Sequence, residues 1–384
     1  MHRRDPNKRE GIILFLTLFL MVFLLGLVAF AVDLGFYAST QTEMQRSADA
    51  AAIAAAWDLI ERSPPNAGNS LYDEIRDARD RAVSYVSSNA VAGGAAVDRN
   101  GSNAPEGNVV IGYLANESQS TSPLEFANQN QFNAVQVTVR KSAQQNGEVP
   151  LFFARVWGMT GLEAKGTATA ALINNFGGFA TPSNGSNLQI LPFALDEDTW
   201  NAVLQGNGDD NFKWNDYMNR VDSGRDGVLE FNLYPQGTGS PGNRGTVDIG
   251  SSNNSTSDLA RQIVHGISPT DLEHLGGSLQ FNNQGTLTLN GDTGISAGVK
   301  DELASIIGQR RIIPIFRSVS GPGNNAQYVI TKFVGVRILA VQLTGKMSGK
   351  YLIVQPANVV ALGGIPKSGP QTTYSIYSPV RLIH

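Results

Sequence analysis

The chain has 384 residues, a formal net charge of −4 and 16% charged residues, a balance that excludes the basic surface typical of nucleic-acid-binding proteins. It contains no cysteine, which excludes disulfides, thiolate catalysis, cysteine-ligated zinc and a lipidated N-terminal cysteine. The length suits about two domains. The 41 glycines, without a collagen-like period, indicate a β-rich exported protein with many turns.

An almost unbroken apolar segment runs from Ile12 to Val32 and carries no charged residue. About 20 helical residues at 1.5 Å each cross a hydrocarbon core of roughly 30 Å, so this segment predicts a transmembrane helix. The next basic residue after it is Arg46, whereas residues 1–10 contain Arg3, Arg4, Lys8 and Arg9. This asymmetry predicts that the leader (residues 1–10) is cytoplasmic and that the rest of the chain is exported.

A cleaved signal peptide is the alternative to a permanent anchor, because Ala29-Phe30-Ala31 offers a small-residue cleavage site. Two features favour the anchor. The apolar run of the predicted transmembrane helix, residues 11–32, is longer than the apolar core of a signal peptide, and helix-favouring sequence continues past the cleavage site. N-terminal sequencing that found a start at Val32 would establish cleavage instead.

The helix-favouring sequence after the membrane segment extends from Asp33 to Leu59 without a proline. Alanine, which has the best helix propensity, dominates residues 48–56, and the resulting thin helix lets another helix or a sheet approach closely. Pro64-Pro65 is predicted to end this helix. A second helix is predicted over residues 70–88, with Ser70 as its N-cap, an apolar stripe and a charged, solvated face.

A small sheet is predicted to follow the second helix. Strands are expected over residues 109–114, 132–139 and 163–173, and the middle one shows the period-2 alternation of a half-buried strand. A short helix is expected over residues 149–157, with Leu151, Phe152 and Val156 facing inward. The Gly/Ser/Asn-rich segment 176–188 is predicted to be a linker that ends this first exported region, residues 33–175.

Residues 189–384 are predicted to form a second, mainly β domain. Helices are expected at 257–266, with a restart at Ser268, and at 296–307, closed by Gly308 in the C′ position. Short hydrophobic segments predict strands near 188–194, 228–233, 246–249, 287–289, 312–316, 328–343 and 351–354. The predicted fold class is therefore α+β: one transmembrane helix that continues into a long pilin-like helix with a small antiparallel sheet, followed by the β domain.

The N-terminal segment resembles the TadE/TadG-like family of the Flp (tight-adherence, Tad) pilus-assembly machinery. The resemblance is strongest over residues 9–56 and rests on the apolar run, Val32-Asp33-Leu34-Gly35, and the string QRSADAAAIAAA that begins at Gln45. A weaker similarity follows in PLFFARVWG, residues 150–158, which leads into EAKGTATA, residues 163–170. Together these segments predict a family-like, pilin-like region up to residue 175.

The resemblance implies a non-enzymatic, single-pass protein of the bacterial inner membrane. Its expected partners are the membrane and other Tad pilus-assembly proteins or pilin-like helices, with a homo-oligomer as a further possibility and no nucleic acid. Processed pseudopilins of this system have a Gly before the cleavage site and a Glu five residues into the mature helix. A cut after Gly11 would place Leu16 at that position, so processing is not expected. Asp33 is expected to be interfacial rather than a buried ion site.

Candidate metal and catalytic residues carry weaker signals, and we predict no catalytic, cofactor-binding or metal site. Some TadG proteins contain a von Willebrand factor A domain with a D-x-S-x-S metal site. The nearest string here is Asp292-Thr-Gly-Ile-Ser296, in which Gly294 replaces the first serine, and a turn with Ser296 capping the next helix is favoured. His265 and His274 flank Asp271 and Glu273 without zinc spacing.

Asp222-Ser-Gly-Arg-Asp226-Gly227 resembles half of a calcium loop. Gly224 stands where a third ligand is needed, and Leu233 occupies the position of the bidentate Glu, so a turn between strands is favoured. No Walker loop or zincin helix is present in the sequence.

The sequence therefore favours a membrane-anchored, TadG-like component of pilus assembly or envelope attachment. Close helix packing is conceivable at Gly26 and the small residues after Ala29. An anchored ligand-binding or surface-adhesion module is the main alternative, and an anchored hydrolase with a dispersed triad is a further one.

Overall fold

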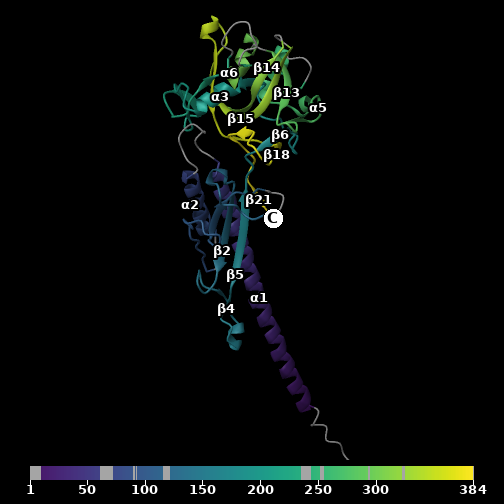
Figure 1. The fold of residues 1–384 in the computed structure, drawn as a ribbon. Coiled ribbons are helices and arrows are strands. Elements are labelled where there is room, and N and C mark those ends of the chain that lie inside the picture. Colours follow the sequence, from purple (N-terminus) through teal and green to yellow (C-terminus); the bar gives the residue numbers. More distant parts are fainter. Residues whose placement is uncertain are drawn as a thin grey trace, which may run out of the picture.

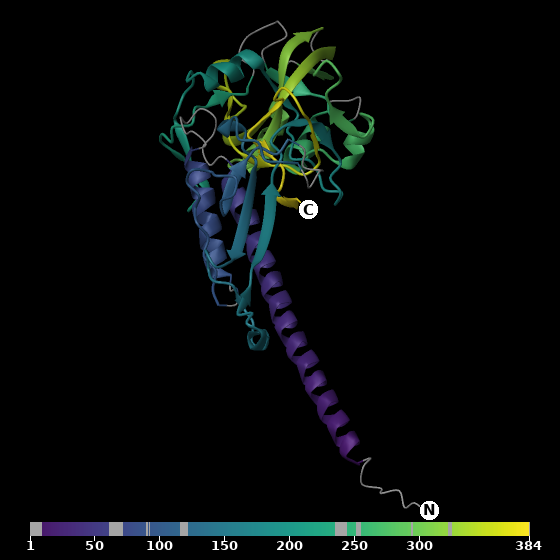
Figure 2. The same ribbon diagram turned by 60° about the horizontal axis from the view of Figure 1, so that its bottom comes forward.

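A computed structural model describes residues 10–60, 72–89, 91, 93–115, 122–234, 244–250, 255–292, 295–321 and 325–383. The predictions for the basic leader, for Pro64-Pro65 and for the Ser70 cap lie outside these residues. Figures 1 and 2 show a long helical rod that leads into a small helix-and-sheet layer, with a larger β region at the far end. The α+β class, with a long apolar N-terminal helix and a mainly β C-terminal region, is confirmed.

Helix α1 (Glu10–Asp58) is continuous for 49 residues, about 74 Å if straight. Its apolar half is exposed on all sides, with Leu14 74% and Val28 61% exposed. Its alanine-rich half is fully buried at Ala48, Ala52 and Ala55. Among the described residues, α1 is the one helix long and apolar enough to cross a membrane, judged by length and composition.

The first core forms where α1 packs against helix α2 and a four-stranded antiparallel sheet of order β1-β2-β5-β21. The elements up to β5 are α2 (Tyr72–Ser88), β1 (Val109–Gly112), η2 (Gln129–Gln131), β2 (Ala134–Lys141), β3 (Val149–Pro150), η3 (Ala154–Trp157), β4 (Gly161–Leu162) and β5 (Ala164–Ala171). Small residues on both surfaces explain the close approach of α1 to the sheet. A Cβ added to Gly166 of β5 would lie 2.6 Å from the backbone of Met44 and Gln45.

Two predictions near this sheet are wrong. The segment 149–157 is a two-residue strand followed by one turn of 3-10 helix, and Phe152 and Val156 are 54% and 84% exposed rather than inward. The helix is short because β3 pairs with β4, which holds the chain extended up to Pro150. The segment 176–188 contains strand β6 (Phe176–Ala180), whose Phe176 and Phe179 are buried, so its first part is not a solvated linker.

The C-terminal region is built around an eight-stranded sheet of order β10-β16-β15-β13-β11-β7-β14, with β19 paired to β15. Strand β14 also pairs with β15, so five of these strands form a closed ring. The strands are β7 (Phe193–Asp196), β10 (Phe231–Asn232), β11 (Arg244–Val247), β13 (Leu287–Asp292), β14 (Arg310–Ser320), β15 (Ala326–Gln342), β16 (Tyr351–Pro356) and β19 (Thr373–Tyr374). Apolar residues of the ring contribute to two core clusters.

Shorter elements surround this ring. Strand β6 joins β12 (Ser278–Gln280) and β18 (Gly364–Pro366), β8 (Phe212–Asn215) pairs with β9 (Arg220–Ser223), and β17 (Val359–Val360) pairs with β20 (Ile376–Tyr377). The helices are α3 (Glu197–Leu204), α4 (Thr256–His265), α5 (Pro269–Glu273), η4 (Ala297–Val299), α6 (Lys300–Ser305) and η6 (Met347–Gly349). The predicted helix over 296–307 is thus a 3-10 turn followed by a short α-helix, and Gly308 has the expected positive φ of 85°.

The last described strand crosses back to the first region. Strand β21 (Arg381–Ile383) pairs with β5, with Leu382 opposite Ala170, and Figure 1 shows β21 beside β5. Tyr377 contributes to the first core. The predicted assignment of residues 189–384 to one separate domain is therefore corrected at its end, because residues 381–383 complete the N-terminal sheet.

Candidate functional site

The junction between the exposed and buried halves of α1 is organised around Asp33. Its carboxylate accepts hydrogen bonds from the backbone N–H groups of Phe152, Phe153 and Ala154, at donor–acceptor distances of 2.7–3.2 Å. Asp33 is 4% exposed. Asp33 is expected at the membrane interface and not as a buried ion site. The structure corrects its exposure, because the carboxylate is buried under the loop whose N–H groups it binds.

The capped loop, residues 151–162, owes its position to this carboxylate. Three successive N–H groups at the start of η3 have no partner within a single-turn helix, and a charged acceptor satisfies them. Phe152 adds an edge-to-face contact with Phe36 of α1, at 5.2 Å between ring centroids. An apolar cavity of about 110 Å³ lies between α1 and the loop, with Phe30 and Trp157 among its lining residues. The loop is thus fixed against α1 where the apolar run ends.

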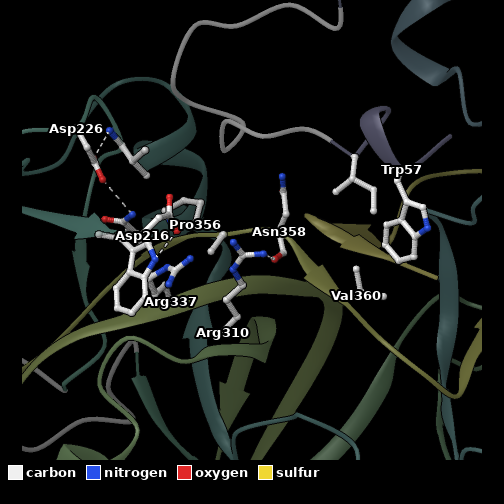
Figure 3. A pocket seen from close by; sticks show the side chains of 13 residues that line it. Trp57, Asp216, Asp226, Arg310, Arg337, Pro356, Asn358 and Val360 are labelled. Atoms are coloured by element: carbon white, nitrogen blue, oxygen red, sulfur yellow. Dashed lines mark hydrogen bonds between the residues drawn. The ribbon is translucent and has the colours of Figure 1, made fainter. Parts of the chain in front are cut away.

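A larger cleft of about 510 Å³ lies where the end of α1 meets the β region. Figure 3 shows Trp57 on one side of this cleft and Asp226 on the other, with the Arg310 and Arg337 side chains between them. The Arg337 guanidinium stacks over Trp214 at 4.1 Å from the ring centroid and donates to Gly308 O. Its burial, with Arg310 adding to the effect, lowers the pKa of Arg337 to about 10.

The side chains that line this cleft suit an anionic or amide-bearing group. Arg310 donates to the Asn358 carbonyl oxygen at 3.1 Å. Within the described part of the chain, the side-chain oxygens of Gln355 and Asn358 are buried without a hydrogen-bond partner. Neither His nor Ser is among the described residues that line the cleft, whereas Asp216 and Asp226 are.

Two protein-family models match the N-terminal part of the chain. Residues 11–58 match the family model described as Flp pilus-assembly TadE/G-like, and residues 54–170 match the model described as Tad-like Flp pilus-assembly. The two matches together cover residues 11–170. The predicted resemblance is confirmed, including the second, weaker segment. No curated protein and no solved structure matched the chain.

The two motifs that predicted the Tad region touch each other in the fold. Asp33, from Val32-Asp33-Leu34-Gly35, binds the backbone of Phe152 and Phe153, from PLFFARVWG. Sequence reasoning missed this contact because 119 residues separate Asp33 from Phe152. Two sequence features could have indicated the contact. One is an acidic residue directly after the apolar run, and the other is a short aromatic segment without the period-2 alternation of a strand.

The residues predicted as weak metal candidates are engaged in other contacts. The Asp222 carboxylate accepts from Asn215 and Arg220 within the β8–β9 hairpin. Glu230, an acidic residue that follows this segment, accepts the N–H groups of Asn211 and Phe212. The Asp226 carboxylate accepts from the backbone of Val228 and the side chain of Gln355. Among the described residues, no three His, Asp or Glu side chains converge in a way that could hold a metal ion.

The string that begins at Asp292 does not form a von Willebrand factor A site in its described part. Asp292 ends β13, which pairs in antiparallel fashion with β11 and β15, whereas that domain needs a parallel sheet. Ser296 caps η4 through the N–H of Gly298, as predicted. Residues 293–294 lie outside the described part of the chain.

The histidine-flanked segment forms a structural ion-pair network. Asp271 is buried, accepts from Arg261 at 2.6 Å and closes a capping box with Ser268. His265 and His274 are both exposed. Among the described residues these side chains belong to no group that could hold a metal ion, and Asp271 instead holds α4 and α5 together.

Asp248, beside this network, carries a testable pH effect. Its burial, with Asp258 adding to it and His274 opposing it, raises the pKa of Asp248 from 3.8 to about 6. The folded state then binds the proton more tightly than the unfolded state, so stability falls as the pH rises from about 4 to about 6. Asp248→Asn should raise the free energy of unfolding by about 1–2 kcal/mol at pH 8, after allowance for solvent screening, and leave it unchanged near pH 4.

Urea unfolding of both proteins at the two pH values measures this effect. Asp301→Asn is the matched control, because the Asp301 side chain is 88% exposed. Equal stabilisation by Asp248→Asn at both pH values would contradict the raised pKa of Asp248. The stabilisation would then come from contacts of the amide that do not depend on protonation.

Proposed function

We propose that this protein is a membrane-anchored, non-enzymatic component of Flp/Tad-type pilus assembly, similar to TadG. In this proposal α1 crosses the bacterial inner membrane once, with the leader in the cytoplasm and the remainder of the chain exported. Residues 33–175 form the Tad-like exported region, and the β region presents a surface to partners. The Tad family matches over residues 11–170 support the pilus-related role.

The observation that carries the proposal is the two-part character of α1. Its first half is apolar and exposed on every side, which water disfavours and lipid favours. Its second half belongs to the core of the exported region without a break or kink residue such as proline. A rigid connection of this kind transmits the position of the membrane helix to the exported region.

The same burial limits which part of α1 is free to meet a partner. Ala48, Ala52 and Ala55 are covered by the chain's own sheet and by α2. The exposed positions just outside the apolar run include Leu34, Ser39 and Thr42. Contacts with other pilus-assembly proteins are therefore expected at residues 13–43 of α1 and not at its alanine-rich end.

Site-specific photocrosslinking in cells tests this proposal. A photoreactive residue at Ser39 or Thr42 should crosslink to another pilus-assembly protein, whereas the same residue at the buried Ala52 should not. Absence of any such crosslink from both exposed positions, with the protein present in the membrane fraction, would argue against a role in pilus assembly.

One observation favours a second candidate function, an anchored ligand-binding or adhesion module. The cleft at the end of α1 holds two arginines and two buried amide oxygens, a combination that suits a carboxylate- or amide-bearing ligand. A glycan or peptide array probed with the full-length protein would distinguish the two functions. The full chain is needed because β21 belongs to the N-terminal sheet.

A further inference from the structure

The capped loop exposes a dense set of large apolar side chains. Exposed fractions are 54% for Phe152, 46% for Phe153, 84% for Val156, 67% for Trp157 and 51% for Met159. Water-soluble surfaces carry isolated apolar side chains, whereas a contiguous group marks a surface that is covered by something else. Arg155 is the only charged residue between positions 151 and 162.

The height of the loop along α1 identifies what covers it. The apolar run of α1 ends at Val32, and its roughly 20 residues fill a hydrocarbon core of about 30 Å. The loop contacts α1 at Asp33 and Phe36, and its cavity includes Phe30. These contacts place it beside the end of the run, at the level where lipid headgroups would lie. Figure 2 shows this segment beside α1, at the edge of the exported region that faces the apolar half.

The composition of the loop suits that level. Tryptophan concentrates at the membrane–water interface, where its apolar ring and its polar N–H are both accommodated, and the phenylalanine, valine and methionine side chains beside it are apolar enough to enter the acyl boundary. The exposed Arg155 can reach lipid phosphates while its neighbours enter the acyl boundary.

Most of the backbone N–H groups of residues 151–159 are hydrogen-bonded within the protein, which lowers the cost of moving the loop into a weakly hydrated environment. Unpaired N–H groups make loops costly near lipid. Asp33 accepts three of them, from Phe152, Phe153 and Ala154. Further N–H groups bond within the loop, from Leu151 to Thr160, from Val156 to Phe153, from Gly158 to Arg155 and from Met159 to Ala154. The Asp33 cap therefore allows an apolar loop to approach lipid with few free donors.

We propose that the capped loop inserts Phe152, Phe153, Val156, Trp157 and Met159 into the outer headgroup region of the bilayer that α1 crosses. The inference rests on the proposed membrane anchoring and adds a second, peripheral contact to it. Two contacts, one spanning and one peripheral, fix the tilt and the rotation of α1 about its axis. The exported region then stands in a defined orientation above the membrane.

Spin-label accessibility in lipid nanodiscs tests the insertion. The chain contains no cysteine, so Val156→Cys gives a single labelled site on an exposed side chain. Two matched sites frame it: Val22→Cys, in the middle of the apolar run and 61% exposed, and Tyr217→Cys, in the β region and 92% exposed. Relaxation is measured with dioxygen, with a soluble nickel chelate and with a headgroup-tethered nickel lipid.

We expect the headgroup-tethered nickel to relax the label at position 156 most strongly, dioxygen to relax the label at position 22, and soluble nickel to dominate at position 217. Equal access of soluble nickel to positions 156 and 217, with position 22 in lipid, would overturn the loop insertion and leave the anchor intact. A label at position 156 shielded from all three reagents would overturn it in favour of a protein contact. Aqueous access at position 22 would overturn the anchor and the insertion together.

Discussion

Gly166→Val is expected to detach α1 from its own sheet and to lower the free energy of unfolding of the Tad-like region by about 3 kcal/mol or more. The new Cβ would lie 2.6 Å from backbone atoms of Met44 and Gln45, and a helix backbone cannot yield as a flexible side chain does. Valine has a higher β propensity than glycine, but that gain is at most about 1 kcal/mol. The steric clash therefore outweighs the gain in β propensity, and Gly166→Val lowers the free energy of unfolding. Gly166→Ala should lower it by a smaller amount.

Hydrogen exchange of the full-length protein in nanodiscs, followed by mass spectrometry along a urea series, measures the loss. Peptides that cover residues 44–56 of α1 and β5 should exchange at lower urea concentration than in the wild type. Gly101→Val is the matched control, because a Cβ at Gly101 meets no atom within 4 Å. Unchanged protection of residues 44–56 in folded Gly166→Val would show that α1 does not depend on this close approach.

The elements that the sequence predicted well are those with a local signal. The apolar run and the alanines that follow it define α1 almost to the residue, because length, charge and helix propensity all agree there. The long strand β15 follows from its hydrophobic segment, and the helix α2 follows from its apolar stripe at helical spacing. The Tad family assignment also rests on short contiguous motifs.

The remaining features depend on contacts between distant residues. The return of β21 to β5 pairs Leu382 with Ala170, and neither segment carries a signal that names its partner. The ring closes because β14 pairs with both β15 and β7, and strand propensity does not predict which strands pair. The segment 149–157 is predicted as a short helix with Leu151, Phe152 and Val156 inward, whereas Phe152 and Val156 are exposed. Their exposure follows from the Asp33 cap and from the β3–β4 pairing.

Asp33→Ala is expected to release the capped loop from α1. Loss of an ordinary N-cap side chain raises local opening about fivefold, and Asp33 satisfies three N–H groups instead of one. Amide exchange at Phe152, Phe153 and Ala154 should therefore accelerate by roughly tenfold or more. Asp33→Asn keeps one acceptor oxygen and should give an intermediate rate.

The matched control for this prediction is Asp196→Ala. Asp196 caps α3 through a single bond to the N–H of Thr199, so its loss should accelerate exchange at the start of α3 and leave residues 152–154 unchanged. Wild-type exchange at residues 152–154 in Asp33→Ala would contradict the cap. If exchange in Asp33→Ala stayed unchanged while the crosslink from Ser39 to another pilus-assembly protein disappeared, Asp33 would act in a contact with that partner and not as a cap. If exchange and the lipid access of position 156 both change, the acidic residue of the Tad motif positions the loop that meets the membrane.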